Sequence, residues 1–422
     1  MRVALLFPGQ GSYLPGVFAG LGADTDLISD QVAEIDEAAA EYGVKPVRPL
    51  LFSPNAPSLG VLLKSDPDRM DVATVATSLA LAALLESRYG LTADHVVGHS
   101  LGEFAALSVA GVLTPGDAVR AVCERHTALR EAPPPAGGMV AVEADPERAE
   151  ELIASVHAST VAVSSVNAPG QSVVSGAEGD LIRVWDAARA AGLRTSRLKV
   201  VLPFHVPVLA KASAAYAQRL PSVPMAAPRE RFCYSHGLGR FLTGEDDVVA
   251  LMVDDMTRPV RFHDAVRALD AEGVTAYVEC GALDVLTRLV SGTLPAALTV
   301  APLREALTAP DLSGRLDSLG PAATAASMAT AADPEVLETV RAVCAELLEY
   351  PLETLTDDAH FQADLGVDSL GMTELLERSL RRYGLQHLFH VADNGDYDTV
   401  ADLAALVTGL LRDETLSAPE QR

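Results

Sequence analysis

A serine lies between two glycines in the segment Gly98-His99-Ser100-Leu101-Gly102, which fits the pattern G-x-S-x-G. Alone the pattern is weak evidence, because glycine and serine are common residues. Its setting strengthens it, since the strand candidate His95–Gly98 precedes the serine and the helix candidate Leu101–Val112 follows at once. A tight turn between a strand and a helix exposes the serine hydroxyl and directs the helix N-terminus toward a developing oxyanion. Ser100 is therefore a candidate nucleophile.

A second serine, Ser369, begins a helix candidate after the segment Asp364-Leu365-Gly366-Val367-Asp368. Serine is common at helix N-caps, but that role does not explain the residues before it. The whole segment resembles the phosphopantetheine attachment sequence of acyl and peptidyl carrier proteins, over about residues 335–411. A phosphodiester on Ser369 would lie at the positive end of the helix dipole. The resemblance makes Ser369 the predicted attachment site of a covalent 4′-phosphopantetheine.

A serine needs a general base to attack a thioester, and periodicity does not choose among the ten histidines of this chain. Three motifs taken together do choose: Phe7-Pro8-Gly9-Gln10-Gly11-Ser12, then the serine motif with Glu103 after it, then Pro203-Phe204-His205. In this order they resemble malonyl-CoA:acyl carrier protein transacylases and the acyltransferase domains of polyketide synthases. The resemblance covers about residues 1–307 and implies a hydrolase-like α/β core.

The resemblance assigns catalytic roles to five residues. It implies that Ser100 is acylated and that His205 is the general base, which returns its proton to the departing thiol. The backbone amides of Gln10 and Leu101 would form the oxyanion hole. In the family a main-chain carbonyl, usually of Asn or Gln, orients the histidine, and Asp255 stands at that position. Two possibilities stay open: the Asp255 carbonyl serves in the same way, or its carboxylate contacts His205 in a more conventional triad.

Substrate binding is predicted at two further residues. Arg125 lies 25 residues after Ser100, the offset of the family's carboxylate-binding arginine, and a guanidinium can pair both oxygens of a malonyl carboxylate. Taken alone, an arginine on a helix is more often an exposed surface residue. Asn167 matches a polar loop that faces the cleft in the family, although a turn residue has an equally good structural role. Phe204 resembles the malonyl-selective form of the family.

Other positions depart from the family and keep alternatives open. Tyr13 stands where many members have Gln, and residues 281–284 replace a more glycine-rich stretch. The alternatives to malonyl transfer from coenzyme A are transfer of a non-malonyl group between carrier proteins, and hydrolysis that edits misloaded carriers. A non-catalytic carrier scaffold is a third alternative, which the intact Ser100 and His205 make the weakest.

The pattern of apolar residues predicts an α/β fold followed by a helical bundle. Short strands alternate with helices in residues 1–130, as in a mainly parallel sheet. Residues 138–200 show the order β-α-β-β-α-β of a ferredoxin-like module. Three apolar stripes after Pro334 predict a small bundle. The predicted domains are an acyltransferase domain at 1–307 with a ferredoxin-like subdomain at about 134–200, a linker at 308–332, an acyl carrier domain at 333–412 and a tail at 413–422.

Composition limits the partners. The net charge is −25, and residues 333–422 hold 19 of the acidic residues against 6 arginines, so nucleic acid is not expected as a partner. The expected partners are an acyl-coenzyme A, its own and other acyl carrier domains, a phosphopantetheinyl transferase, and components of a polyketide or fatty acid synthase. Four widely spaced cysteines predict no metal site and suit a reducing compartment. With no leader or membrane segment expected, the predicted location is the cytoplasm.

Overall fold

The computed structural model describes residues 2–20, 25–229, 232–304, 333–348, 355–357, 361, 369–385 and 399–417. It divides into two compact units, and the described residues up to 304 and from 333 onward belong to different units. The linker predicted at 308–332 lies outside the described residues.

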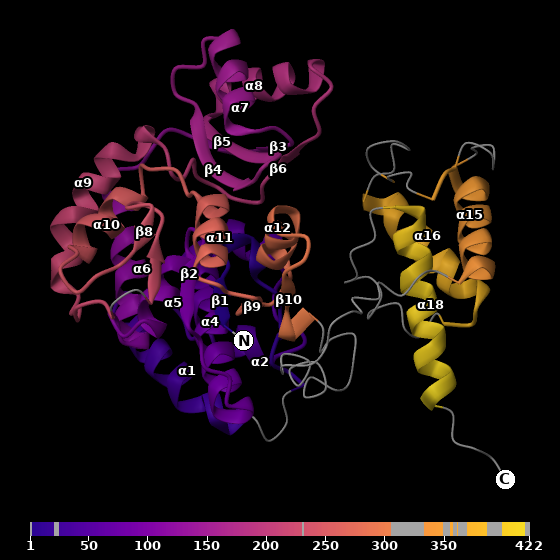
Figure 1. The fold of residues 1–422 in the computed structure, drawn as a ribbon, viewed down its shortest axis with the longest axis horizontal. Coiled ribbons are helices and arrows are strands. Elements are labelled where there is room, and N and C mark those ends of the chain that lie inside the picture. Colours follow the sequence, from indigo (N-terminus) through magenta and orange to yellow (C-terminus); the bar gives the residue numbers. More distant parts are fainter. Residues whose placement is uncertain are drawn as a thin grey trace. The chain divides into compact units, whose positions relative to one another are not determined.

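The larger unit is built on a six-stranded sheet in the order β10-β9-β1-β2-β7-β8 (Figure 1). All pairs are parallel except that of β7 with β8. The strands are β1 (Val3–Phe7), β2 (His95–Gly98), β7 (Cys233–Ser235), β8 (Arg240–Phe241), β9 (Ala276–Glu279) and β10 (Leu298–Val300). Alternate residues of β1 enter two different cores, because Leu5 and Phe7 pack in one and Ala4 and Leu6 in the other. A sheet covered on both faces explains why its strands are continuous apolar runs.

Helices supply the remainder of both cores. They are α1 (Thr25–Ala40), α2 (Arg48–Phe52), α3 (Leu59–Ser65), α4 (Pro67–Tyr89), α5 (Gly102–Val109), α6 (Pro115–Glu131), α9 (Ala210–Arg219), α10 (Val248–Asp255), α11 (Phe262–Ala271) and α12 (Val285–Thr293). Within the part of the chain that the structure describes, α4 is the one helix whose length and hydropathy would suit a membrane span, and 83% of that stretch is buried inside the fold. It is the central helix of the core.

The predicted ferredoxin-like module is confirmed. Its elements are β3 (Gly137–Val142), α7 (Pro146–Ser155), β4 (Ala162–Ala168), β5 (Gln171–Ala177), α8 (Glu178–Ala190) and β6 (Thr195–Arg197). The sheet is antiparallel in the order β4-β5-β3-β6, with α7 and α8 on one side of it (Figure 1). A separate hydrophobic core joins the two helices to the sheet.

Two predicted elements are shorter in the structure. The helix predicted at Leu101–Val112 ends at Val109, because Gly111 takes a φ of 77° and the Val112 amide donates to the Leu107 carbonyl. The strand predicted at Arg194–Val200 is only Thr195–Arg197, since the chain turns where the Val200 amide donates to the Leu198 carbonyl.

The second unit is a helical bundle, as predicted. Its helices are α15 (Pro334–Leu348), α16 (Ser369–Arg382) and α18 (Val400–Ser417). Their apolar stripes form one core that includes Val340, Leu376, Leu380, Leu403 and Val407. Helix α18 runs to Ser417 and therefore includes the first residues of the segment predicted as a tail.

Candidate active site

Ser100 lies on a strained turn between β2 and α5. Its φ is 56°, a left-handed value that non-glycine residues seldom adopt. The glycines on either side leave no space for a side chain: a Cβ on Gly98 would lie 2.3 Å from the Cα of Glu103, and one on Gly102 would lie 1.8 Å from the Phe7 carbonyl oxygen. This close packing of the turn against β1 is the geometry of a nucleophile elbow.

His205 contacts the Ser100 hydroxyl directly. Its Nε2 lies 2.7 Å from Oγ of Ser100, although the two residues are 105 positions apart in the chain. The imidazole is 3% exposed, and the His205 backbone amide donates to the Met256 carbonyl over 3.1 Å. His205 also has a positive φ, 63°. The loop after the small module therefore holds the imidazole in one place against the serine.

The main chain of Asp255 orients His205. The Asp255 carbonyl oxygen lies 2.8 Å from Nδ1 of His205, whereas the nearer carboxylate oxygen lies 3.6 Å away. Of the two possibilities that the sequence leaves open, the carbonyl forms the hydrogen bond. It fixes the tautomer in which Nδ1 carries the proton and Nε2 faces the serine.

A carboxyl that the sequence analysis did not single out lies beside Asp255. Burial, together with the nearby Asp255 carboxyl, raises the pKa of Glu103 well above its ordinary value. Glu103 is in the first turn of α5, directly after the serine motif. The neutral acid can then donate a hydrogen bond to the Asp255 carboxylate. Nothing in the spacing of the motif shows that this glutamate lies against Asp255.

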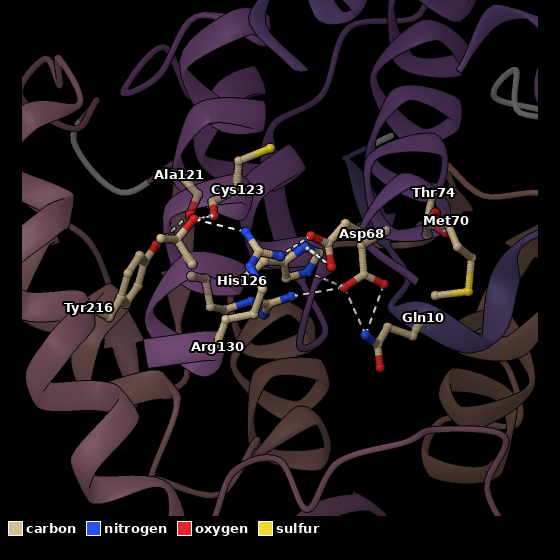
Figure 2. Close-up of polar contacts among 12 residues, drawn as sticks. Gln10, Asp68, Met70, Thr74, Ala121, Cys123, His126, Arg130 and Tyr216 are labelled. Atoms are coloured by element: carbon tan, nitrogen blue, oxygen red, sulfur yellow. Dashed lines mark hydrogen bonds and ion pairs between the residues drawn. The ribbon is translucent and has the colours of Figure 1, made fainter. Parts of the chain in front are cut away.

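Gln10 and Leu101 lie on adjoining segments. Gln10 begins the short 3-10 helix η1 (Gln10–Ser12), and a Cβ on Gly9 would lie 3.4 Å from Cβ of Ser100 and 3.7 Å from the Leu101 nitrogen. The loop after β1 therefore packs on the serine turn. The side-chain amide of Gln10 points elsewhere, with Nε2 2.8 Å from both carboxylate oxygens of Asp71 (Figure 2).

Arg125 is buried, unlike an ordinary surface arginine. It is 4% exposed on α6, and its guanidinium carbon lies 5.0 Å from the ring centre of Phe104 and 5.5 Å from that of Phe204. One guanidinium nitrogen, Nη2, lies 3.4 Å from Oδ2 of Asp71. Its Nε is buried without a hydrogen-bond partner among the described residues. Because Phe204 directly precedes His205 in the chain, its contact with Arg125 places the arginine near the Ser100–His205 pair.

Asn167 contacts His99, the residue before Ser100. Its Oδ1 accepts a hydrogen bond of 2.8 Å from Nε2 of His99, and its Nδ2 donates to Gln171 over 3.3 Å. Burial lowers the pKa of His99 to about 4, so this imidazole is neutral. An isolated bridge between Ser165 and Val260 attaches β4 to the segment that follows Asp255. The small module therefore meets the rest of the larger unit beside Asn167.

Two residues near Arg125 were missed from the sequence. Asp71 lies on α4 and is 1% exposed, and His126 follows Arg125 on α6 and is 6% exposed. Both come from long helices whose buried faces are mostly apolar, so a buried charge there has no signature in periodicity. A signal was present, since an aspartate in the apolar run of α4 needs a buried partner.

Comparison with known proteins decides the family. Residues 4–326 match the acyl transferase domain family, and residues 338–407 match the phosphopantetheine attachment site family. This chain belongs to the acyl transferase domain family. The resemblance drawn from the three motifs is confirmed. The second unit of this acyltransferase, called the carrier unit from here on, takes a covalent phosphopantetheine.

The acyltransferase is similar to proteins of several lengths. It is 34% identical over 340 residues to polyketide synthase GfsB of Streptomyces halstedii, covering 78% of this chain but 6% of that protein. It is 29% identical to the malonyl CoA-acyl carrier protein transacylase of Bacillus subtilis, covering 68% of this chain and 89% of that protein. Among solved structures, a loading acyltransferase from the avermectin modular polyketide synthase matches with a TM-score of 0.65 and 31% identity, covering 75% of this chain and 98% of that one. The acyltransferase spans only a small part of the polyketide synthases it matches.

Proposed function

We propose that this acyltransferase moves a malonyl group from coenzyme A, through an ester on Ser100, to a phosphopantetheine thiol on an acyl carrier protein, including its own carrier domain, for polyketide or fatty acid biosynthesis. The observation that carries the proposal is the 2.7 Å contact between Oγ of Ser100 and Nε2 of His205. Because Nδ1 donates to the Asp255 carbonyl, Nε2 of the neutral ring has no proton and can accept that of the serine.

The proton transfers follow from this geometry. Oγ of Ser100 attacks the thioester carbon while its proton passes to Nε2 of His205. The backbone amides of Gln10 and Leu101 would stabilise the oxyanion, where losing one donor typically costs about 3–4 kcal/mol of barrier. When the carbon–sulfur bond breaks, His205 returns the proton to the leaving thiolate, and the acyl group stays on Ser100 as an ester. In the second half-reaction the same groups act in the reverse order on the incoming thiol.

The carrier unit has a helix N-terminus where the cofactor would be attached. Helix α16 begins at Ser369, so a phosphodiester on that residue would lie at the positive end of the helix. When bound, phosphopantetheine supplies a thiol on a flexible arm that accepts the acyl group. A phosphopantetheinyl transferase is the partner required to install it.

The choice of malonyl rests on Arg125. The guanidinium is buried between Phe104 and Phe204, and its Nε finds no partner in the described part of the chain. A carboxylate on the acyl group would satisfy this donor with a charge-assisted hydrogen bond. The relative of Bacillus subtilis, which is named for malonyl transfer, supports the same substrate.

Labelled malonyl-coenzyme A tests the proposal on the full chain carrying phosphopantetheine. In the wild type, label should appear on the carrier domain; in Ser369→Ala, it should accumulate on the acyltransferase domain. Ser100→Ala and His205→Ala should take up label at least about a thousandfold more slowly, because nucleophile and base act as a unit. Loading of Ser100→Ala at the wild-type rate would overturn the proposal.

The same experiment separates the alternatives. An editing hydrolase would release free malonate faster than it loads the carrier. A transferase between carriers would accept acyl groups from a second acyl carrier protein and leave coenzyme A thioesters unused. Products resolved by mass spectrometry of the intact protein and of the free acids distinguish these outcomes.

A further inference from the structure

A buried carboxylate joins two parts of the proposed site. Asp71 on α4 is 1% exposed, and both of its oxygens lie 2.8 Å from Nε2 of Gln10. Its Oδ2 lies 2.8 Å from Nε2 of His126 and 3.4 Å from Nη2 of Arg125. Gln10 and His126 reach this cluster from different elements, η1 and α6 (Figure 2). Asp71 therefore connects the loop of the proposed oxyanion hole with the proposed carboxylate-binding arginine.

This position of Asp71 conflicts with the role proposed for Arg125. An arginine paired with a buried carboxylate presents no net charge to a substrate. A second carboxylate arriving beside the first would be repelled, and a buried repulsion is weakly screened. Arg125 can attract an acyl carboxylate only if another cation balances Asp71.

His126 supplies that cation. Its Nε2 lies 2.8 Å from Asp71, and its Nδ1 lies 3.0 Å from Oδ1 of Asp68. Nε2 is within hydrogen-bond distance of Asp71, and Nδ1 is in ion-pair contact with Asp68 outside hydrogen-bond geometry. Two carboxylates this close on opposite sides of the ring favour its charged form, the imidazolium, because nearby opposite charges stabilise it. Burial alone would lower the pKa of His126, but the interactions with Asp68 and Asp71 outweigh it and raise that pKa above its ordinary value.

The charged groups around His126 are few. Asp68 and Asp71 face it from α4, and Arg130 of its own helix pairs with Asp68. Among the described residues, the other charged groups packed on α6 have different partners. Glu34 of α1 binds Gly116, and Glu41, just after α1, binds Arg120. Arg219 of α9 binds Glu124 and Glu131, and Glu103 of α5 lies against Asp255. In the part of the chain that the structure describes, Arg125, His126 and Arg130 thus face Asp68 and Asp71, and one positive charge is left over.

We propose that Asp71 and His126 set the charge that Arg125 presents to an acyl carboxylate: the imidazolium of His126 balances Asp71, and Arg125 keeps its charge and its Nε–H for the substrate. The inference rests on the proposed malonyl transfer. Asp71 and His126 act through Arg125, so they are positioning residues and touch neither the thioester nor the nucleophile. When His126 loses its proton, Asp71 is left with Arg125 as its nearest cation, and the preference for an anionic acyl group falls.

The test compares two substrates on the full chain carrying phosphopantetheine. The ratio of kcat/KM for malonyl-coenzyme A to that for acetyl-coenzyme A is measured in the wild type, His126→Gln and the double variant His126→Gln/Asp71→Asn. His263→Gln is the matched control, because His263 lies on α11 and its Nδ1 lies 3.4 Å from the Thr293 hydroxyl. A ratio of two substrates cancels any effect on the steps at Ser100 and His205 that both substrates share. Fluorescence of Trp185, the single tryptophan, checks that each variant is folded.

The double variant is the decisive measurement, because it separates a charge-balancing role of His126 from a structural one. His126→Gln should lower the ratio at least about tenfold, as expected when one charge-assisted hydrogen bond to the substrate is weakened. Adding Asp71→Asn removes the unbalanced carboxylate and should restore the ratio to within about threefold of the wild type. In the wild type the ratio should fall as the pH rises from 6 to 9, and in the double variant it should stay flat. The pH series tests the inference even where His126→Gln does not fold.

The outcomes separate the inference from the proposed function. A wild type that prefers malonyl, combined with a ratio that neither His126→Gln nor pH changes, would overturn the inference alone. A double variant no better than His126→Gln would do the same, because it would show a structural role. A wild type that takes up acetyl as well as malonyl would overturn both the inference and the malonyl assignment.

Discussion

The main-chain oxygen of Asp255 lies 2.8 Å from Nδ1 of His205, while the carboxylate of the same residue lies 3.6 Å away. Asp255 thus contacts the histidine through its backbone and not through its side chain. The carboxylate is occupied by its interaction with Glu103.

The first prediction follows from this contact. Asp255→Asn should keep kcat/KM for malonyl-coenzyme A within about threefold of the wild type, because the carbonyl that holds the histidine tautomer remains. In a Ser-His-Asp triad, the same change of the aspartate lowers kcat by about ten-thousandfold. Steady-state loading of the carrier measures the difference, with Asp254→Asn on the exposed side of the helix as control. A loss of more than a hundredfold would show that the carboxylate orients His205.

The second prediction concerns Gly102, two residues after Ser100. Gly102→Ala should lower the free energy of unfolding of the larger unit by at least about 3 kcal/mol, because its Cβ would overlap the Phe7 carbonyl at 1.8 Å and the backbone of β1 cannot move away. Urea denaturation followed by Trp185 fluorescence measures the change in the same compact unit. Gly170→Ala, which meets nothing within 4 Å, is the control and should change stability by less than about 1 kcal/mol. Equal effects of the two substitutions would contradict the tight elbow.

These residues also show how far the sequence could be interpreted. The strands Val3–Phe7 and His95–Gly98 and the ferredoxin-like module were predictable, because short buried strands and their order leave a strong pattern. The pairing of Ser100 with His205 was not derivable from spacing, since it joins distant loops, and it came from the family resemblance. The contacts of Asp71, His126 and Glu103 were missed, because a titratable side chain on a mostly apolar helix face can be interpreted only when its partners on other elements are placed.

The third prediction tests the proposed substrate contact. Arg125→Ala should lower kcat/KM for malonyl-coenzyme A by about a hundredfold, the loss expected for a buried charge-assisted pair, and should lower that for acetyl-coenzyme A far less. The kcat/KM of Arg125→Lys for malonyl-coenzyme A should lie between those of the wild type and Arg125→Ala, since an ammonium keeps the charge but not the planar fork. Arg148→Ala, an exposed residue of α7 paired with Glu151, serves as control. Equal losses for both thioesters would assign Arg125 a structural role.

The fourth prediction is the pH dependence of stability. The pKa of His126 is raised, so its protonation stabilises the fold fully below pH 6.5, and the contribution is lost as the pH rises through the raised value. The pKa of Asp68 is lowered to about 2, so its contribution is present above pH 3.8 and is lost as the pH falls toward 2. Burial opposes this lowering, and the interactions of Asp68 with His126 and Arg130 together outweigh it. The free energy of unfolding should therefore be highest between these limits.

Urea titrations of the wild type and His126→Gln at several pH values between 4 and 9 measure the contribution of His126 to the free energy of unfolding. The difference in unfolding free energy between the two proteins should be largest below pH 6.5 and should shrink toward pH 9. A difference that does not change with pH would mean that folding does not shift the pKa of His126, and a difference that shrinks as the pH falls would mean that His126 is neutral in the folded protein.

The fifth prediction is that the carrier domain is loaded within its own chain. A tether of some tens of residues gives an effective concentration in the millimolar range, far above the concentration of protein in an assay. The rate constant for loading from acylated Ser100 should then be independent of protein concentration over a hundredfold dilution. Rapid-quench measurement with labelled malonyl-coenzyme A, followed by digestion that separates the two domains, gives this rate.

Mixing two variants provides the matched control for transfer between chains. Ser369→Ala retains Ser100, and Ser100→Ala retains the carrier serine, so label reaches a carrier in the mixture only between molecules. That rate should rise linearly with concentration and remain below the wild-type rate at micromolar protein, because the partner is free in solution. If the mixture loads as fast as the wild type at every dilution, the tether has no kinetic role and the natural recipient is a separate carrier protein.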